Sequence, residues 1–159
     1  FVGYNPGIVS AIEGHYYARP GNVFWRQLSA SGLVDRVVTC EDDGLLMDEA
    51  GIGFTDMCPR PTVRAGELRQ DEIRDGAARL HMELLENQPG IACFSGKGIY
   101  EHFGRWALKL SRAELSKRAY GEQPERIGQT GLWVIPSSSG LASKWHKERM
   151  EWMLRLAAR

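Results

Sequence analysis

The residues with the clearest chemical potential lie at the start of the chain, where an apolar segment runs into the turn Asn5-Pro6-Gly7. Pro6 disfavours helical backbone at Asn5, so the segment should be a strand that ends there, with the carboxamide projecting past its tip. Glycines at positions 3 and 7 let a ligand approach the backbone closely. Because ligands bind at the carboxyl ends of strands in open α/β sheets, Asn5 is a candidate active-site residue. The alternative is a turn in which Asn5 only satisfies backbone amides.

A pair of aromatic residues, Phe24 and Trp25, begins a predicted helix. Neighbouring residues on a helix point about 100° apart, so the two rings cannot easily share one face. We expect Trp25 in the core. Phe24 is either a second core residue or a ring that stacks on a flat ligand.

A serine-rich loop at residues 136–143 follows a predicted buried strand at residues 131–135, and it therefore leaves the same sheet edge as Asn5. Hydroxyl groups and free backbone amides suit contacts to phosphate or sugar. Leu141 is an apolar side chain within this polar loop, and Lys144 and Lys147 follow it. It either packs into the core or is an exposed wedge that enters a base stack.

Other candidates carry weaker signals. Asp56 closes the segment 51–57, where it is either a capping or turn residue or a carboxylate that contacts a ligand. The Gly-Lys-Gly run at residues 96–98 lacks the spacing of a phosphate loop. The four histidines and three cysteines show no metal-ligand spacing, so we expect reduced thiols, no metal and no cofactor.

The elements that must position these residues alternate between strands and helices. Strands are predicted at the start of the chain and within residues 51–57, 91–94 and 131–135, and residues 8–22 should be irregular. Helices are predicted over residues 22–31, 44–50, 70–86, 97–103 and 144–158, with a surface helix or structured insertion at 105–118. This order predicts one α/β domain over residues 1–159, with three α/β/α layers around a central, mainly parallel four-stranded sheet.

The formal net charge of zero hides an asymmetry, because residues 101–159 carry eleven basic side chains against six acidic ones. A positive third of a chain suits a phosphate backbone, although solvated helix faces produce the same bias. No apolar run approaches the roughly 20 residues that span a bilayer. The sequence starts directly at a strand without Met, so we expect its natural N-terminus to be missing.

Taken together, these segments resemble the mismatch-specific uracil-DNA glycosylase and thymine-DNA glycosylase family over nearly the whole chain. The resemblance rests on residues 3–7 (Gly-Tyr-Asn-Pro-Gly), 20–25 (Pro-Gly-Asn-Val-Phe-Trp), 51–56 (Gly-Ile-Gly-Phe-Thr-Asp), 96–100 (Gly-Lys-Gly-Ile-Tyr) and 136–141 (Pro-Ser-Ser-Ser-Gly-Leu). It implies a monofunctional DNA glycosylase. Such an enzyme flips uracil, and in some members thymine or another damaged pyrimidine, mispaired with guanine out of double-stranded DNA. It then hydrolyses the glycosidic bond and leaves an abasic site for base excision repair.

The resemblance also implies a role for each candidate residue. Asn5 would hold the attacking water, Phe24 would stack on the extruded pyrimidine, and Leu141 would fill the vacated space. Gly140 and Ala142 would contact the unpaired guanine. The remaining assignments are base contacts by Tyr4, Ser10 and Ser137, and DNA-backbone contacts by Ser138, Ser139 and Lys144.

Two departures from the family pattern bear on chemistry and specificity. Where this chain has Asp56, other members carry Asn or Lys, and a carboxylate there could activate water or stabilise positive charge on the sugar. Ser137 stands where some members carry a base-contacting Asn, so direct base contacts should be fewer. Ser10 should border the position of the thymine methyl group and so influence whether thymine is accepted.

Two rival functions remain. An α/β hydrolase or phosphotransferase could use the serine loop, but the chain lacks a nucleophile elbow, a phosphate loop and a recognisable His partner. A catalytically feeble sensor of damaged bases would have the same fold. We expect a monomer without a membrane segment, located in the cytoplasm at the nucleoid of a bacterium or in the nucleus of a eukaryote.

Overall fold

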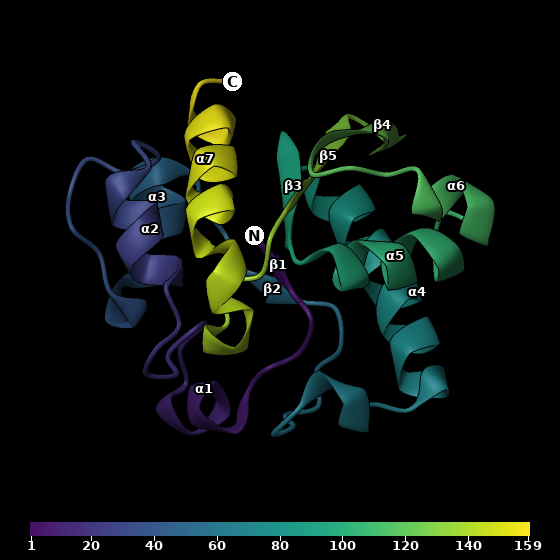
Figure 1. Ribbon diagram of the computed structural model, residues 1–159, viewed down its shortest axis with the longest axis horizontal. Coiled ribbons are helices and arrows are strands. Elements are labelled where there is room, and N and C mark those ends of the chain that lie inside the picture. The colour runs from purple at the N-terminus through teal and green to yellow at the C-terminus, as the bar shows by residue number, and fades with distance from the viewer.

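A five-stranded sheet forms the centre of the computed structural model, which describes residues 1–159 (Figure 1). In spatial order its strands are β2 (Thr55–Asp56), β1 (Val2–Gly3), β3 (Ile91–Ser95), β5 (Thr130–Ile135) and β4 (Gly121–Ile127). The first four run parallel, and β4 pairs antiparallel with β5. The α/β class and the mainly parallel sheet are therefore confirmed.

The strand β4 is the one that the sequence did not predict. It reads as polar and contains Pro124, so it lacks the apolar run of the other strands. Alternate residues such as Gln123 and Ile127 are buried, as in an edge strand with one covered face. The register shifts between Glu122 and Arg126, on either side of the proline, which has no N–H to donate to the ladder.

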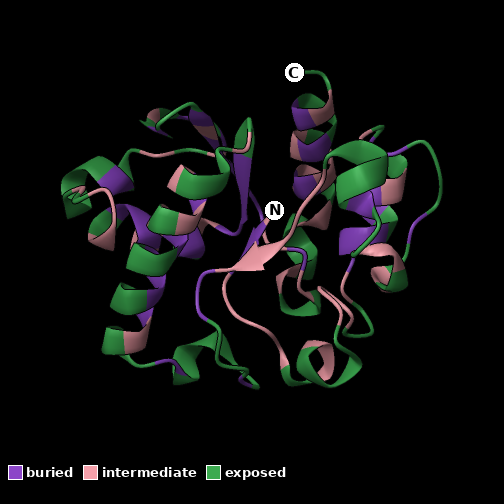
Figure 2. Cartoon of the chain, turned by 180° about the vertical axis from the view of Figure 1, so that it is seen from behind, coloured by how far each residue is buried: buried purple, intermediate pink, exposed green.

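Helices cover both faces of the sheet (Figure 1). One apolar core lies against α4 (Gln70–Asn87), α5 (Lys97–Trp106) and α6 (Arg112–Ser116). The other lies against α2 (Phe24–Ala30), α3 (Leu46–Ala50) and α7 (His146–Ala157). Successive strand residues point to opposite faces, so Phe94 joins the first core and Cys93 the second. The buried residues accordingly concentrate on the strands and on the helix faces that meet them (Figure 2).

The helices match most of the predicted ranges, and α4 agrees closely with the helix expected over residues 70–86. The helix α1 (Ile8–Glu13) is different, because it forms within the stretch expected to be irregular and buries none of its residues. At the other end of the chain, a 3₁₀ segment at Gly140–Trp145 precedes α7, so the last helix begins two residues later than predicted. No helix is both long and apolar enough to cross a bilayer.

The parallel strands all end on the same side of the sheet. Residues 4–7 follow β1, residues 96–98 follow β3, and residues 136–139 follow β5, while Asp56 is the last residue of β2. The topology therefore brings the asparagine turn, the carboxylate and the serine loop to one edge, as the sequence predicted.

Candidate active site

A cavity of about 860 Å³ opens at this edge of the sheet. It brings together most of the residues singled out from the sequence, which is the main agreement between the predicted and observed sites. Its wall contains Tyr4, Asn5, Ser10, Asp56, Ser137, Ser138, Ser139, Leu141 and Ala142. Phe24, Gly140 and Lys144 do not line it.

The side chain of Asn5 has a fixed orientation. Its Nδ2 donates to the carbonyl oxygen of Arg60 and to Oγ1 of Thr62, both at 2.8 Å. A backbone carbonyl can only accept, so the nitrogen must face these partners. No protein group donates to Oδ1, which is left to accept a hydrogen bond from a water molecule in the cavity.

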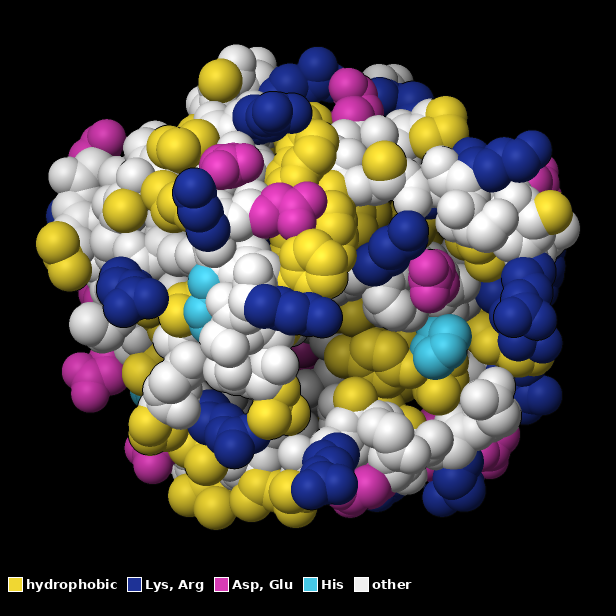
Figure 3. Space-filling view, viewed as in Figure 1, with side chains coloured by type: hydrophobic (Ala, Val, Ile, Leu, Met, Phe, Trp, Pro, Cys, Tyr) yellow, Lys and Arg dark blue, Asp and Glu magenta, His cyan; other side chains and the backbone are white.

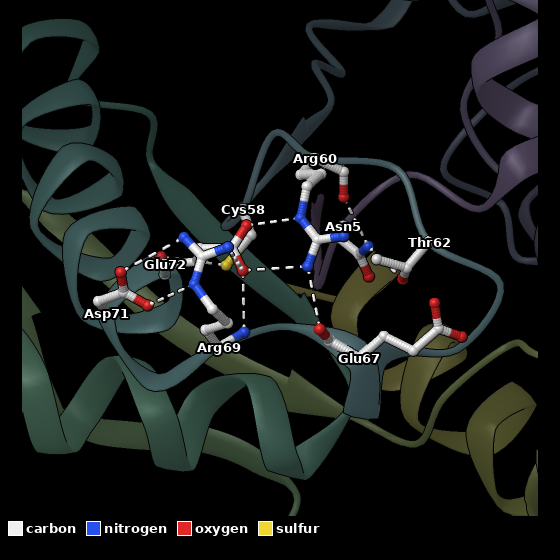
Figure 4. Close-up of polar contacts among 8 residues, drawn as sticks. All are labelled: Asn5, Cys58, Arg60, Thr62, Glu67, Arg69, Asp71 and Glu72. Atoms are coloured by element: carbon white, nitrogen blue, oxygen red, sulfur yellow. Dashed lines mark hydrogen bonds and ion pairs between the residues drawn. The ribbon is translucent and has the colours of Figure 1, made fainter.

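An ion pair holds the loop that orients Asn5 (Figure 4). Arg60 donates from Nε to Oε1 of Glu72 at 2.6 Å and from Nη2 to Oε2 at 3.0 Å. Nη2 also donates to the carbonyl of Glu67 at 2.9 Å. The hydrogen bond from Arg60 lowers the pKa of Glu72 to about 2, so the pair stays ionised at neutral pH. Thr62, which is buried, closes the other side of the loop by donating its N–H to the carbonyl of Pro6 at 3.2 Å.

The carboxylate of Asp56 lies over the backbone of the adjacent strand. Gly3 pairs with Asp56 in the parallel ladder, and a Cβ at position 3 would overlap with Oδ1. Any larger residue at position 3 would therefore have to displace the carboxylate of Asp56 from this place. Burial raises the pKa of Asp56 to about 7, an effect that the positive charge of Arg79 opposes only in part. The carboxylate thus titrates near neutral pH, which suits a group that exchanges a proton during a reaction.

The structure corrects the assignment of the stacking ring. Phe24 is 0% exposed and lies in the core. Tyr17 stacks on it, with ring centroids 4.0 Å apart and planes inclined by 9°, and it is Tyr17 that lines the cavity. The backbone of Tyr17 has a φ of 54°, an uncommon conformation for a residue with a large side chain. Tyr17, which is half-buried, is therefore the candidate stacking ring of the cavity in place of Phe24.

Two further contacts hold the wall around Tyr17. Its hydroxyl donates to Oγ of Ser95 at 3.3 Å. Ser10, on α1, accepts a hydrogen bond from the N–H of Ala18 at 3.1 Å and so links that helix to the segment that carries the ring. Tyr4 directly follows β1, and its hydroxyl is hydrogen bonded to Nδ1 of His102. Burial is the main cause that lowers the pKa of His102, which favours the neutral imidazole.

The serine loop has an internal structure that exposes Leu141. Oγ of Ser139 accepts from the N–H of Leu141 at 3.3 Å, and the carbonyl of Ser139 accepts from Nε2 of His146 at 2.9 Å. Ser138 is buried, and its carbonyl accepts from the N–H of Val23 at 3.1 Å. Leu141 is 82% exposed and lines the cavity. This placement excludes the core alternative for Leu141, while its entry into a base stack stays a prediction.

Basic side chains surround the mouth of the cavity. Arg19, Arg64 and Lys97 belong to its wall, where Asp56 is the single carboxylate. The space-filling view shows Lys and Arg side chains on both sides of the hollow in its lower centre (Figure 3). Such a rim favours a polyanionic ligand. Lys144 lies outside the cavity and over the ring of Trp145, at 5.0 Å.

The sequence did not single out Tyr17, Thr62, Arg19 or Arg64, and it noted Lys97 only within the Gly-Lys-Gly run. The only sequence signal for Tyr17 is that it is one of two adjacent tyrosines in a segment without a clear periodicity. Thr62 had no signal, because its role depends on a loop that folds back against Pro6. No group of three His, Cys, Asp or Glu side chains is arranged to hold a metal ion.

The fold and this arrangement place the chain in a known class. A family model described as the uracil DNA glycosylase superfamily matches residues 1–158, and the chain belongs to that superfamily. It is also similar to a G/U mismatch-specific uracil DNA glycosylase of Schizosaccharomyces pombe, with 35% identity over 162 residues. The alignment covers 99% of this chain and 48% of that protein, so the chain spans about half the length of its relative.

The raised pKa of Asp56 predicts how stability depends on pH. The folded state binds this proton up to about pH 7, whereas the unfolded chain releases it near its ordinary pKa of 3.8. The free energy of unfolding should therefore fall as pH rises from about 4 to about 7. Asp56→Asn cannot ionise, so its stability relative to the unsubstituted protein should increase over this interval by on the order of 3 kcal/mol. Denaturant unfolding of both proteins at pH 4, 6 and 8 measures this difference.

Asp71→Asn is the matched control. The hydrogen bond from Arg69 lowers the pKa of this exposed carboxylate below its ordinary value of 3.8, so Asp71 is ionised in the folded and the unfolded chain at neutral pH. The stability difference between this variant and the unsubstituted protein should therefore stay nearly constant from pH 4 to 8. A difference between the Asp56 variant and the unsubstituted protein that stays constant from pH 4 to 8 would contradict the assignment.

Proposed function

We propose that this chain is a DNA glycosylase that removes uracil mispaired with guanine from double-stranded DNA. It would hydrolyse the bond between C1′ of the deoxyribose and N1 of the base, leaving an abasic site. Membership of the superfamily and the similarity to a G/U mismatch-specific uracil DNA glycosylase support this proposal. Thymine opposite guanine is a second substrate that we include in it.

The observation that carries the proposal is the fixed carboxamide of Asn5. Its nitrogen is engaged on both hydrogens, so its oxygen can orient one water molecule within a cavity whose wall also contains an aromatic face. Orientation of this kind is sufficient for a hydrolysis in which bond breaking runs ahead of attack, because the sugar then resembles an oxocarbenium ion. A neutral amide holds the water without removing its proton.

The base must leave the duplex to reach this site. In the proposed complex the extruded pyrimidine stacks on Tyr17, and Leu141 enters the space that it vacates. The C1′–N1 bond breaks with its electron pair passing to the base, and the water held by Asn5 forms the new bond to C1′. Asp56 accepts the proton that this water loses. Ionised Asp56 also stabilises the positive charge on the sugar.

The DNA backbone would follow the basic rim. Lys97 and Arg64 flank the cavity and can neutralise phosphates next to the flipped nucleotide. Ser138, Ser139 and Lys144 are proposed to contact the backbone, with Gly140 and Ala142 facing the guanine. Ser10 is proposed to border the methyl group of thymine.

An excision assay tests the proposal. A labelled duplex with one uracil–guanine pair, incubated with the protein and treated with alkali, should break at the uracil. Asn5→Ala should lower the single-turnover rate by about a hundredfold or more, because the water is no longer oriented. Asn87→Ala, at the far end of α4, is the matched control and should leave the rate unchanged. The same duplex with thymine in place of uracil tests the second substrate.

Tight binding to the mismatch without strand breakage would instead favour a damaged-base sensor. Breakage that persists in Asn5→Ala would mean that the water is held elsewhere. Indifference to DNA at every salt concentration would reject both functions, since phosphate contacts make binding strongly salt-dependent.

The role of Asp56 predicts a pH-dependent rate. If the ionised carboxylate accepts the proton, the single-turnover rate should rise with pH and level off above about 7, the pKa of Asp56. Asp56→Asn should be slower and should lose this dependence. A rate profile measured from pH 5 to 9 decides the point, and an unchanged rate in the variant would remove Asp56 from the mechanism.

The hydrogen bond between Asn5 and Thr62 predicts a graded effect. Thr62→Val keeps the shape but removes the acceptor, so the carboxamide can rotate, and the single-turnover rate should fall about tenfold. Thr62→Ser keeps the hydroxyl and should retain most of the rate. DNA affinity should not change in either variant. Equal losses in both would show that Thr62 contributes packing and not the orientation of Asn5.

A further inference from the structure

Arg149, on α7, is a buried cation without an acidic partner. Its side chain is 0% exposed, and none of the ion pairs of the chain includes it. Nη1 donates to Oε1 of Gln27 at 2.6 Å and lies 2.6 Å from Sδ of Met153. Nε and Nη2 have no hydrogen-bond partner on the protein. A guanidinium in such a place lowers stability, and an apolar residue of similar size would avoid that cost.

The guanidinium lies behind the aromatic wall of the cavity. Its Cζ is 5.3 Å from the ring centroid of Phe24. Tyr17 occupies one face of that ring at 4.0 Å, so the guanidinium uses the opposite face. The order is therefore Arg149, Phe24, Tyr17 and then the cavity. Phe24, which the family resemblance placed against the base, is the middle layer of this stack.

The cation stays charged at neutral pH. Burial lowers the pKa of Arg149 to about 10, which is still well above 7. The nearest titratable groups, Cys93 and Tyr17, are neutral at that pH, because burial raises the pKa of each. No carboxylate forms an ion pair with the guanidinium, and the apolar surroundings screen its charge weakly.

We propose that Arg149 stabilises the negative charge that develops on the departing pyrimidine, acting from behind the Phe24–Tyr17 stack. This inference rests on the proposed function. When the C1′–N1 bond breaks, its electron pair stays on the base, which leaves as an anion and later takes a proton from solvent. Arg149 touches neither the base nor the water, so it is a positioning residue that sets the electrostatic potential of the base subsite.

The expected effect is moderate. A base stacked on Tyr17 would lie roughly 13 Å from the guanidinium carbon, given the spacing of stacked rings. At an effective dielectric constant of about 20, a unit positive charge at that distance accelerates formation of a unit negative charge by about tenfold.

The test compares two replacements with a control. Arg149→Met removes the charge and keeps the volume, so single-turnover excision of uracil should fall about tenfold while the protein becomes no less stable to denaturant. Arg149→Lys keeps the charge and should retain most of the rate. Arg155→Met is the matched control, because Arg155 also lies over an aromatic ring, Trp152 at 4.5 Å, but is exposed and away from the cavity. It should excise uracil normally.

Leaving-group dependence separates an electrostatic role from a structural one. 5-Fluorouracil is a more acidic base and needs less help to leave, so the deficit of Arg149→Met should be clearly smaller on 5-fluorouracil than on uracil. Affinity for DNA that carries an uncleavable uracil analogue should stay the same. Equal deficits on both bases, an equally slow Arg149→Lys, or joint loss of stability and rate would overturn the proposal.

The outcome can be distinguished from a failure of the proposed function. If the unsubstituted protein excises uracil and Asn5→Ala does not, the proposed function holds, and normal excision by Arg149→Met rejects the role of Arg149 alone. If the unsubstituted protein excises neither base, both proposals are rejected.

Discussion

The two hydrogen bonds from the amide nitrogen of Asn5 are the interaction on which the rest of the site depends. They add side-chain bonds between the turn after β1 and the loop after β2, which backbone bonds from Cys58 to Tyr4 and from Thr62 to Pro6 also join. The two bonds from Asn5 decide which atom of the carboxamide faces the cavity. The ion pair between Arg60 and Glu72 holds the Arg60 carbonyl that accepts from Asn5. Because Glu72 lies in the first turn of α4, this helix contributes to the orientation of the Asn5 carboxamide.

Two charged groups lie on different sides of the site, one near the position of the sugar and one behind the position of the base. Asp56, which is partly desolvated, lies by the strand ends where the sugar would become positive. The guanidinium of Arg149 lies beyond the aromatic stack, on the side where the base would become negative. Neither group needs to move during bond cleavage. The folded protein would then already stabilise the charges that develop when the glycosidic bond breaks. Such preorganised electrostatics lowers the activation barrier of the reaction.

The sequence predicted the layers and the edge of the sheet where the site lies, because alternating apolar segments and turn residues report directly on parallel strands. It failed where burial alone decides the role of a residue. Phe24 and Tyr17 stack on each other, and only the folded chain shows that Tyr17 lies between Phe24 and the cavity. The edge strand β4 was missed for a related reason, since one covered face and Pro124 leave too little apolar pattern.

The strands that lead to Asn5 and Asp56 are the shortest of the sheet. β1 and β2 have two residues each, whereas β3 and β5 pair over five positions. Because β1 and β2 are so short, few backbone hydrogen bonds hold the strands that lead to these two residues. Local unfolding should therefore begin at β1 and β2 while β3 and β5 stay folded. A bound nucleotide that touches both loops would close this weak point. Bound DNA would thus make its own binding site more rigid. Amide hydrogen exchange at the ends of β1 and β2 would slow when DNA is present.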